Sequence, residues 1–203
     1  MSDAYLAALA TRRTHHAITN ASSIPDEKLE VIIKQAVIHT PTAFNTQSGR
    51  AVLVTGAANT KLWNLISESA LKGLEGEAKE IAIAKLTAFG GGYGSVMFFE
   101  DQAVIDEIAA KIPKYASHYS VWSTNSAGML HIAVWTAFAL EGLGASLQHS
   151  GAYSDELMRN IHKTFDLPST WISTAIMPFG IPAGVPAAKT FLPIEDRVKT
   201  CSD

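Results

Sequence analysis

The segment that most constrains the fold is residues 126–143, which is apolar on nearly every side of the helix that it would form. Its apolar side chains follow no single stripe; they are Met129, Leu130, Ile132, Val134, Trp135, Phe138 and Leu140. A helix that is apolar all round must be buried on every side. Its most apolar part, residues 129–140, is far shorter than the roughly 20 residues that span a bilayer. We therefore expect a helix buried in a core or between subunits, and we favour the subunit interface.

Length and charge indicate one globular domain over residues 1–203. A domain of this size buries about 70% of the surface of its unfolded chain, which is enough for a core without disulfides. The 16 basic and 19 acidic residues give a net charge of −3, so we expect no nucleic-acid partner and no membrane surface. Cys201 is the single cysteine, and the charge order at the N-terminus is opposite to that of a secretory signal. We expect a cytoplasmic protein.

Hydrophobic spacing predicts a helix-rich chain with a few short strands. The second helix has clear ends, because Pro25 and Asp26 suit a first turn and Pro41 disfavours helix at Thr40. Helices are expected at residues 3–13, 25–40, 59–71, 75–88, 102–111, 126–143 and 154–167. Strands are expected at residues 50–55, 95–99 and 171–179. The pattern predicts a central sheet covered by helices, and periodicity alone allows either an α+β or an α/β fold.

Several common functional motifs are absent from the sequence. The glycines of residues 90–94 do not follow G-x-G-x-x-G and lead into a strand, which favours a flexible connection over a phosphate loop. P-loop, H-E-x-x-H and C-x-x-C motifs do not occur. The seven histidines are scattered, and Cys201 lies where a nucleophile rarely has an ordered pocket. We expect no metal site, and a helical metal-binding protein is kept as a third alternative.

Two polar clusters stand out instead. The first, Arg12, Arg13, Thr14 and His16, follows the first helix, and its guanidinium groups suit a phosphate or the edge of a polar heterocycle. The second is the amide-rich loop of residues 41–47, between the second helix and the first strand. Taken alone, the first cluster also fits a solvated helix end and the second a turn.

In this order and at this separation, the two clusters resemble the flavin-binding signatures of the nitroreductase family. Further segments extend the resemblance over essentially the whole chain, and they are residues 141–149 (EGLGASLQH), 177–180 (MPFG) and 193–199 (PIEDRVK). The set is similar to a short nitroreductase-like subgroup known from fungi and some bacteria.

The resemblance implies an α+β fold with a mixed central sheet and a homodimer with an exchanged C-terminal extension. It also implies one FMN at each of two sites formed by both subunits, with NADH or NADPH as co-substrate. The apolar helix and the Pro-containing tail agree with a dimer, since neither has an obvious partner surface within one chain.

Carried over by position, the resemblance assigns the cofactor-binding residues. Arg12, Arg13 and Thr14 would contact the FMN phosphate, ribityl chain or pyrimidine edge, and His16 stands where the family often has Lys or Arg. Three residues, Thr42, Ala43 and Asn45, would approach the flavin held mainly by the other subunit, and Gln47 would support their loop.

The remaining assignments concern the ring face and the second phosphate cation. Gln148 and His149 would lie near the isoalloxazine ring, and Lys189 resembles the C-terminal phosphate-binding lysine. Phe191 occupies a place where the family often has arginine, so we expect Arg197 to substitute for it.

The resemblance implies that no protein acid, base or nucleophile is needed, because the flavin carries the chemistry. The expected activity is ping-pong reduction of nitroaromatic acceptors, and of quinones, by NAD(P)H through flavin N5. Phe44, Tyr115, His118 and Trp122 are candidates to line the acceptor opening, although such aromatic residues also serve as packing. A non-catalytic flavin-binding or regulatory dimer is the alternative, since the sequence has no dedicated catalytic side chain.

Overall fold

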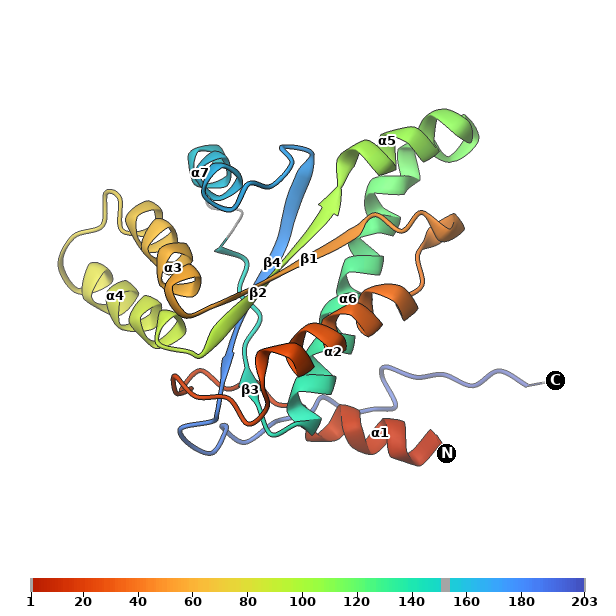
Figure 1. Ribbon diagram of the computed structural model, residues 1–203. Helices are drawn as coiled ribbons and strands as arrows, with labels where there is room; N and C mark the ends of the chain where they lie inside the picture. Colours follow the sequence, from red (N-terminus) through yellow and green to blue (C-terminus); the bar gives the residue numbers. More distant parts are fainter. Residues whose placement is uncertain (1, 151–153, 203) are drawn as a thin grey trace.

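The fold is that of a computed structural model, which describes residues 2–150 and 154–202. Its α-helices are α1 (Ser2–Thr11), α2 (Asp26–His39), α3 (Gly56–Ala70), α4 (Gly76–Gly90), α5 (Gln102–Lys111), α6 (Tyr119–Leu140) and α7 (Asp155–Phe165). Its strands are β1 (Gly49–Thr55), β2 (Gly94–Asp101), β3 (Gly144–Ala145) and β4 (Trp171–Gly180), and two 3₁₀ turns are η1 (Ala43–Asn45) and η2 (Pro113–His118). Figure 1 shows the helices placed around the sheet.

The strands form one sheet in the order β1-β2-β4-β3, and each named neighbour pair is antiparallel. An antiparallel sheet with helices on its faces defines an α+β fold, which decides the question that periodicity left open. A parallel pairing of the kind expected for a mixed sheet occurs as an isolated bridge between Thr14 and Ala145.

The sheet separates two hydrophobic cores, and the central strand β2 contributes to both. Val96 and Phe98 face a core shared with α2 and α6, whereas Met97 and Phe99 face a core shared with α3 and α7. This alternation follows from the two-residue period of a strand, and it explains why β2 is buried along nearly its whole length. Figure 1 shows α2 and α6 on one side of the sheet and α3, α4 and α7 on the other.

The long helix α6 begins seven residues earlier and ends three residues earlier than the predicted segment of residues 126–143. Its own chain does not bury it on every side. Val121, Met129 and Leu140 are 59%, 41% and 62% exposed. The sequence thus identified an unusually apolar helix, and part of its surface is left uncovered by this chain.

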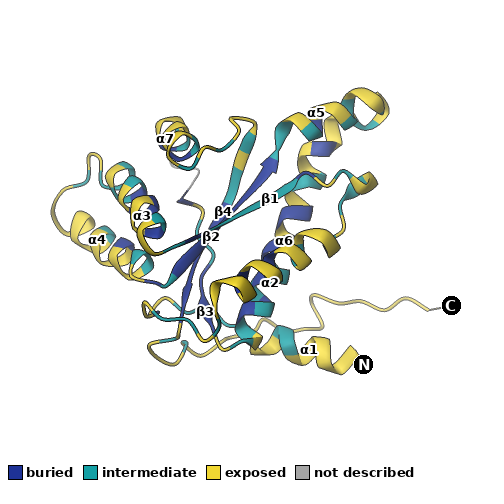
Figure 2. Ribbon diagram, in the orientation of Figure 1, coloured by how far each residue is buried: buried dark blue, intermediate teal, exposed yellow. Residues whose placement is uncertain are grey.

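The ends of the other helices and strands show which sequence signals predicted them correctly. Helix α5 has the predicted bounds, and α2 begins one residue later and ends one residue earlier than the predicted range of residues 25–40. The short elements β3, η1 and η2 were missed, because two to six residues carry little periodicity. Within the described residues, no helix combines the length and the apolar character that crossing a membrane requires. Figure 2 shows that α4 and the C-terminal tail are largely exposed.

Candidate functional site

The first polar cluster lies beside β3, the end strand of the sheet. The backbone N–H of His15 donates to the Ala145 carbonyl at 2.9 Å, and Thr14 bridges to the same residue. These contacts fix the segment that carries Arg12, Arg13 and His16 against the body of the domain.

Arg12 is a partly buried cation that forms no ion pair with any of the described residues. Its guanidinium carbon lies 4.4 Å from the centre of the Trp135 ring on α6, a cation–π distance. Its Nε atom is buried and has no hydrogen-bond partner among the described residues. Burial, and secondarily the neighbouring Arg13 charge, lower the pKa of Arg12. An unpaired donor in such surroundings is costly, so this group suits a negatively charged ligand.

Arg13 points to the C-terminal tail, where its Nη2 donates to the Ala187 carbonyl. Lys189, the predicted phosphate-binding lysine, lies 5.1 Å from the Phe191 ring in the exposed tail. Arg197 lies farther along the tail and is also exposed. The single chain therefore does not bring these two cations to the cavity described next.

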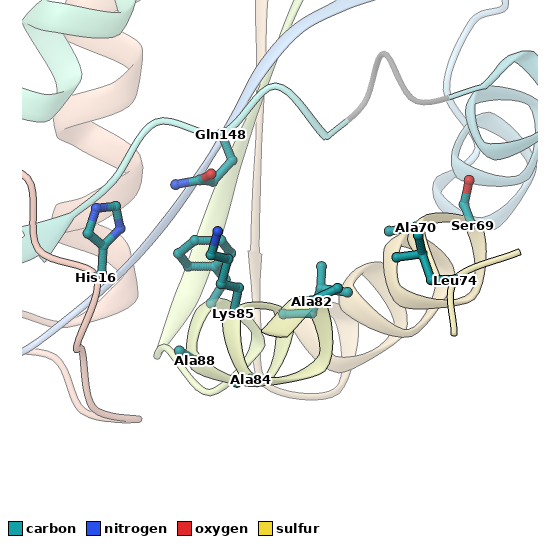
Figure 3. Close-up of a pocket in the computed structure, with 11 residues that line it drawn as sticks. His16, Ser69, Ala70, Leu74, Ala82, Ala84, Lys85, Ala88 and Gln148 are labelled. Carbon is teal, nitrogen blue, oxygen red and sulfur yellow. The ribbon is translucent and has the colours of Figure 1, made fainter. Parts of the chain in front are cut away.

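A cavity of about 1000 Å³ opens between α3, α4 and the first polar cluster. We call it the α4 cavity; its lining residues are His16, Ser69, Ala70, Leu74, Ala82, Ala84, Lys85, Leu86, Ala88, Phe89 and Gln148. Figure 3 shows His16, Lys85 and Gln148 gathered at one end, with Ser69 and Leu74 at the other. The structure thus brings together His16 and Gln148, two residues selected from distant parts of the sequence.

Lys85 and Phe89 belong to this cavity but were missed by the sequence analysis. Phe89 lies between the His16 ring at 6.0 Å and the Trp63 ring at 5.7 Å. The signal available in the sequence was the number of alanines in α4. In the structure this helix buries Leu86 alone and exposes small residues such as Ala84 and Ala88. A helix with such a sparse packing face leaves room beside it.

His149 is exposed near the α4 cavity, and its electrostatic neighbour is the buried His131. The His131 ring lies 4.7 Å from the Phe98 ring, and its Nε2 is 3.0 Å from the Thr174 hydroxyl. Burial first, and then the charge of His149, lower the pKa of His131 to about 4. His131 is therefore neutral at pH 7 and belongs to the core.

The second polar cluster forms a tight loop that packs against the first turns of α6. Phe44, Asn45 and Gln47 have φ values of 54°, 53° and 52°, a left-handed conformation that is uncommon for residues other than glycine. The Thr42 hydroxyl accepts a 2.9 Å hydrogen bond from the Gln47 N–H, and the Thr46 hydroxyl donates to the Ala43 carbonyl. The loop is therefore closed by its own side chains.

The aromatic residues proposed for the acceptor side form one cluster on this loop. The Phe44 ring lies 5.6 Å from that of Tyr115 and 5.9 Å from that of Trp122, and His118 lies 5.4 Å from Trp122. A second cavity of about 380 Å³ adjoins them, between η1 and α6. Phe44 is 54% exposed, so the cluster presents an aromatic edge outward.

The two polar clusters do not meet within one chain. Arg12 packs on Trp135 and Phe44 packs on Trp122, so the contacts lie thirteen residues apart on α6. At the helical rise this separation is about 20 Å. A single ligand site made from both clusters would need a second copy of the chain.

The described residues offer no evident set of metal ligands. Across residues 2–150 and 154–202, no group of three or more His, Cys, Asp or Glu side chains is arranged to hold an ion. Cys201 is free and exposed in the tail.

Comparison with known proteins places this helix-covered antiparallel domain in a class of oxidoreductases. The model of the nitroreductase family matches residues 9–181, and the chain belongs to that family. Nitroreductase FRM2 from Saccharomyces cerevisiae is 31% identical over 194 residues, which cover 93% of each protein. The structure of nitroreductase CinD from Lactococcus lactis in complex with nicotinic acid is 36% identical, has a TM-score of 0.87, and is matched over 98% of this chain and all of that chain.

CinD has also been solved in complex with 4-nitrophenol, and that structure is 34% identical with a TM-score of 0.84. It too is matched over 98% of this chain and over its own full length. The family is generally flavin dependent, with nicotinamide co-substrates, and its members are typically homodimers. These likenesses extend over nearly the whole described chain, including both polar clusters.

Proposed function

We propose that the protein is an FMN-dependent NAD(P)H oxidoreductase that reduces nitroaromatic acceptors, and also quinones, as a homodimer. The observation that carries the proposal is the α4 cavity, which has His16, Lys85 and Gln148 at one end. Arg12, in the same polar cluster as His16, adds a buried Nε that has no hydrogen-bond partner among the described residues. A wide apolar cavity with a few polar groups at one end suits a flat ring that has one polar edge.

The residues fit FMN at both ends of that cofactor. The buried Arg12 Nε has no partner within the described part of the chain, and a phosphate monoester would supply one, with the Arg13 charge nearby. Lys85, His16 and Gln148 would hold the pyrimidine edge through cationic and amide donors. The Ala-lined wall of α4 and the Phe89 ring would exclude water from the ring.

When bound, FMN supplies hydride transfer, first from the nicotinamide and then to the acceptor at the same open face. The role of the protein's own residues is to bind the cofactor and to orient the substrates against it. Positive charge from Lys85 at the pyrimidine edge favours the anionic reduced state of the cofactor, which raises its tendency to accept electrons. One face used in turn by donor and acceptor predicts ping-pong kinetics.

The second chain would complete each site with its loop. Thr42, Ala43 and Asn45 would approach the flavin bound by the partner, and Gln47 would hold their loop, as its N–H bond to Thr42 supports. The uncovered apolar face of α6 and the exposed tail with Phe191 and Leu192 also support a dimer, since both leave apolar surface unpartnered in one chain. In that dimer Lys189 and Arg197 of the exchanged tail would reach the phosphate.

An absorbance spectrum of the purified protein, followed by anaerobic titration with NADH and then NADPH, tests this function. We expect a yellow protein whose flavin absorbance bleaches with one or both donors and returns when a nitroaromatic compound is added. Protein that contains no flavin and cannot be reconstituted with FMN would contradict the proposal. Reduction without acceptor-dependent reoxidation would instead indicate a non-catalytic flavin-binding dimer.

A further inference from the structure

Glu100 is a buried carboxyl group with no role in the function proposed above. It lies on β2 directly after the core residues Phe98 and Phe99, and it is 5% exposed. Burial raises the pKa of Glu100, while the Ser48 hydroxyl and the Arg50 charge oppose the rise. Since a buried carboxyl group is costly, its partners indicate what it stabilises.

The partner of Glu100 is the residue that follows the second polar cluster. The Ser48 hydroxyl donates to Glu100 Oε2, and Ser48 is 1% exposed. The Ser48 carbonyl accepts a 2.9 Å bond from the Asp101 N–H. Ser48 is thus held through its side chain and its backbone by two consecutive residues at the end of β2.

Arg50 adds a second connection to the same place. Its Nη1 donates to the Gln47 carbonyl at 2.8 Å, and its Nη2 forms an ion pair with Asp101 at 3.0 Å. The end of the loop is therefore attached to β2 at both Gln47 and Ser48. We call the Ser48–Glu100 pair the loop clamp.

The loop needs such an attachment because its conformation is unfavourable by itself. Left-handed conformations at Phe44, Asn45 and Gln47 persist only where the surroundings hold them. A gap of about 10 Å³ separates the loop from α6, and Thr42, Ser48 and Tyr119 are among its lining residues. With so little free space behind it, the loop has little room to shift towards α6.

We propose that Glu100 is a positioning residue which, through Ser48, holds residues 42–47 in the conformation that meets the flavin of the partner subunit. The inference rests on the function proposed above. An apolar side chain at position 100 would fill the same space but leave the buried Ser48 hydroxyl without its acceptor.

The test compares variants that remove one side of the clamp with a variant that keeps it. Ser48→Ala removes the donor, Glu100→Met removes the acceptor at similar volume, and Glu100→Gln keeps an accepting oxygen. Glu107→Gln on the exposed face of α5 is the matched control, because its partner Lys111 is also exposed. FMN affinity is measured by titrating flavin-stripped protein, and hydrogen exchange of residues 42–48 is measured on the same samples.

We expect Ser48→Ala and Glu100→Met each to weaken FMN binding about tenfold, the loss typical of a broken buried hydrogen bond. The double variant should also lose about tenfold and not a hundredfold, because both changes break one interaction. Glu100→Gln and Glu107→Gln should stay close to wild type, and exchange should accelerate in residues 42–48 of the first two variants.

Three results would overturn the proposal that the loop clamp positions residues 42–47. The first is wild-type FMN affinity in both Ser48→Ala and Glu100→Met. The second is a loss of affinity in Glu100→Gln equal to that in Glu100→Met, and the third is unchanged exchange in residues 42–48. If wild-type protein binds no FMN, the proposed function fails together with the flavin part of this inference, while exchange still decides whether Glu100 positions the loop.

Discussion

The two polar clusters differ in how many partners their own chain gives them. In the first cluster, Arg12 has a buried donor without a partner among the described residues, and His16 borders, together with Lys85, about 1000 Å³ of open space. In the loop of residues 42–47, hydroxyl and amide groups bond to one another, and Phe44 packs among aromatic rings. Under the proposed function, the first region would receive a ligand, whereas the second would present a fixed edge.

This difference explains how a site can be divided between two chains. A receiving half needs cations and space that the chain itself leaves unfilled. A presenting half needs a rigid conformation before the partner arrives, because ordering it later would reduce affinity. Arg12 of the first half and Phe44 of the second pack against α6 at points about 20 Å apart.

The largest predicted effect tests the helix that both regions share. His131 has a folded pKa of about 4, against 6.5 in the unfolded chain. The unfolded state therefore binds a proton that the folded state rejects, and stability is lost as the pH falls from 6.5 towards 4. The shift corresponds to about 3 kcal/mol. Chemical denaturation at several pH values measures the loss, and His131→Asn should remove most of this pH dependence; an unchanged slope in that variant would assign the effect to other groups.

The receiving half should fail when its unpaired cation is removed. Arg12→Ala is expected to weaken FMN binding about a hundredfold, or about 2.7 kcal/mol, because a charge-assisted contact to the phosphate is lost. Titration of flavin-stripped protein measures the change. Lys34→Ala serves as the control, since Lys34 lies on the exposed face of α2 and pairs only with Glu30 among the described residues. Equal affinities for Arg12→Ala and the control would remove Arg12 from the site.

A smaller effect is expected at Lys85, which the sequence analysis missed. Lys85→Met should lower FMN affinity about tenfold and slow its reduction by NAD(P)H, because the positive charge at the pyrimidine edge is gone. Lys85→Arg keeps the charge and should recover most of both quantities. Stopped-flow reduction and equilibrium titration measure them. If the Met and Arg variants behave alike, the contribution of Lys85 is not its charge.

The smallest effect concerns the presenting half. Tyr119 is 2% exposed, and its hydroxyl has no hydrogen-bond partner among the described residues. Tyr119→Phe removes a buried polar atom without breaking a contact, so the free energy of unfolding should rise by up to about 1 kcal/mol. Urea denaturation at pH 7 measures the difference. A clear loss of stability would mean that this hydroxyl has a partner in the assembled protein.

Sequence reasoning predicted regular elements well where periodicity and end signals agreed. Pro25 and Pro41 delimit α2, and the spacing of Val104, Ile105 and Ile108 gave the bounds of α5. It could not choose between parallel and antiparallel strands, because that choice depends on contacts between distant segments. The apolar helix was identified, but its first turns, with Ser120, Ser123 and Thr124, are too polar to predict.

The candidate site was predictable in part. His16 and Gln148 were selected and do line one cavity, since the order of motifs carried them. Lys85 was missed because it is a lone cation between Ala84 and Leu86. The left-handed loop was missed because Phe44 and Gln47 carry no signal for positive φ. The Ser48–Glu100 contact joins residues 52 positions apart, and no local pattern indicates it.

The central claim is that each flavin site takes one polar cluster from each chain, and a mixed dimer tests it most directly. One chain carries Arg12→Ala and the other carries Asn45→Gly, which removes the side chain but tolerates the positive φ. Differently tagged chains are co-purified, and bound FMN is measured at a concentration that saturates wild type. The account predicts little flavin in either homodimer and half the wild-type content in the mixed dimer, because one of its two sites is intact. A mixed dimer that binds no more flavin than the two homodimers would contradict it.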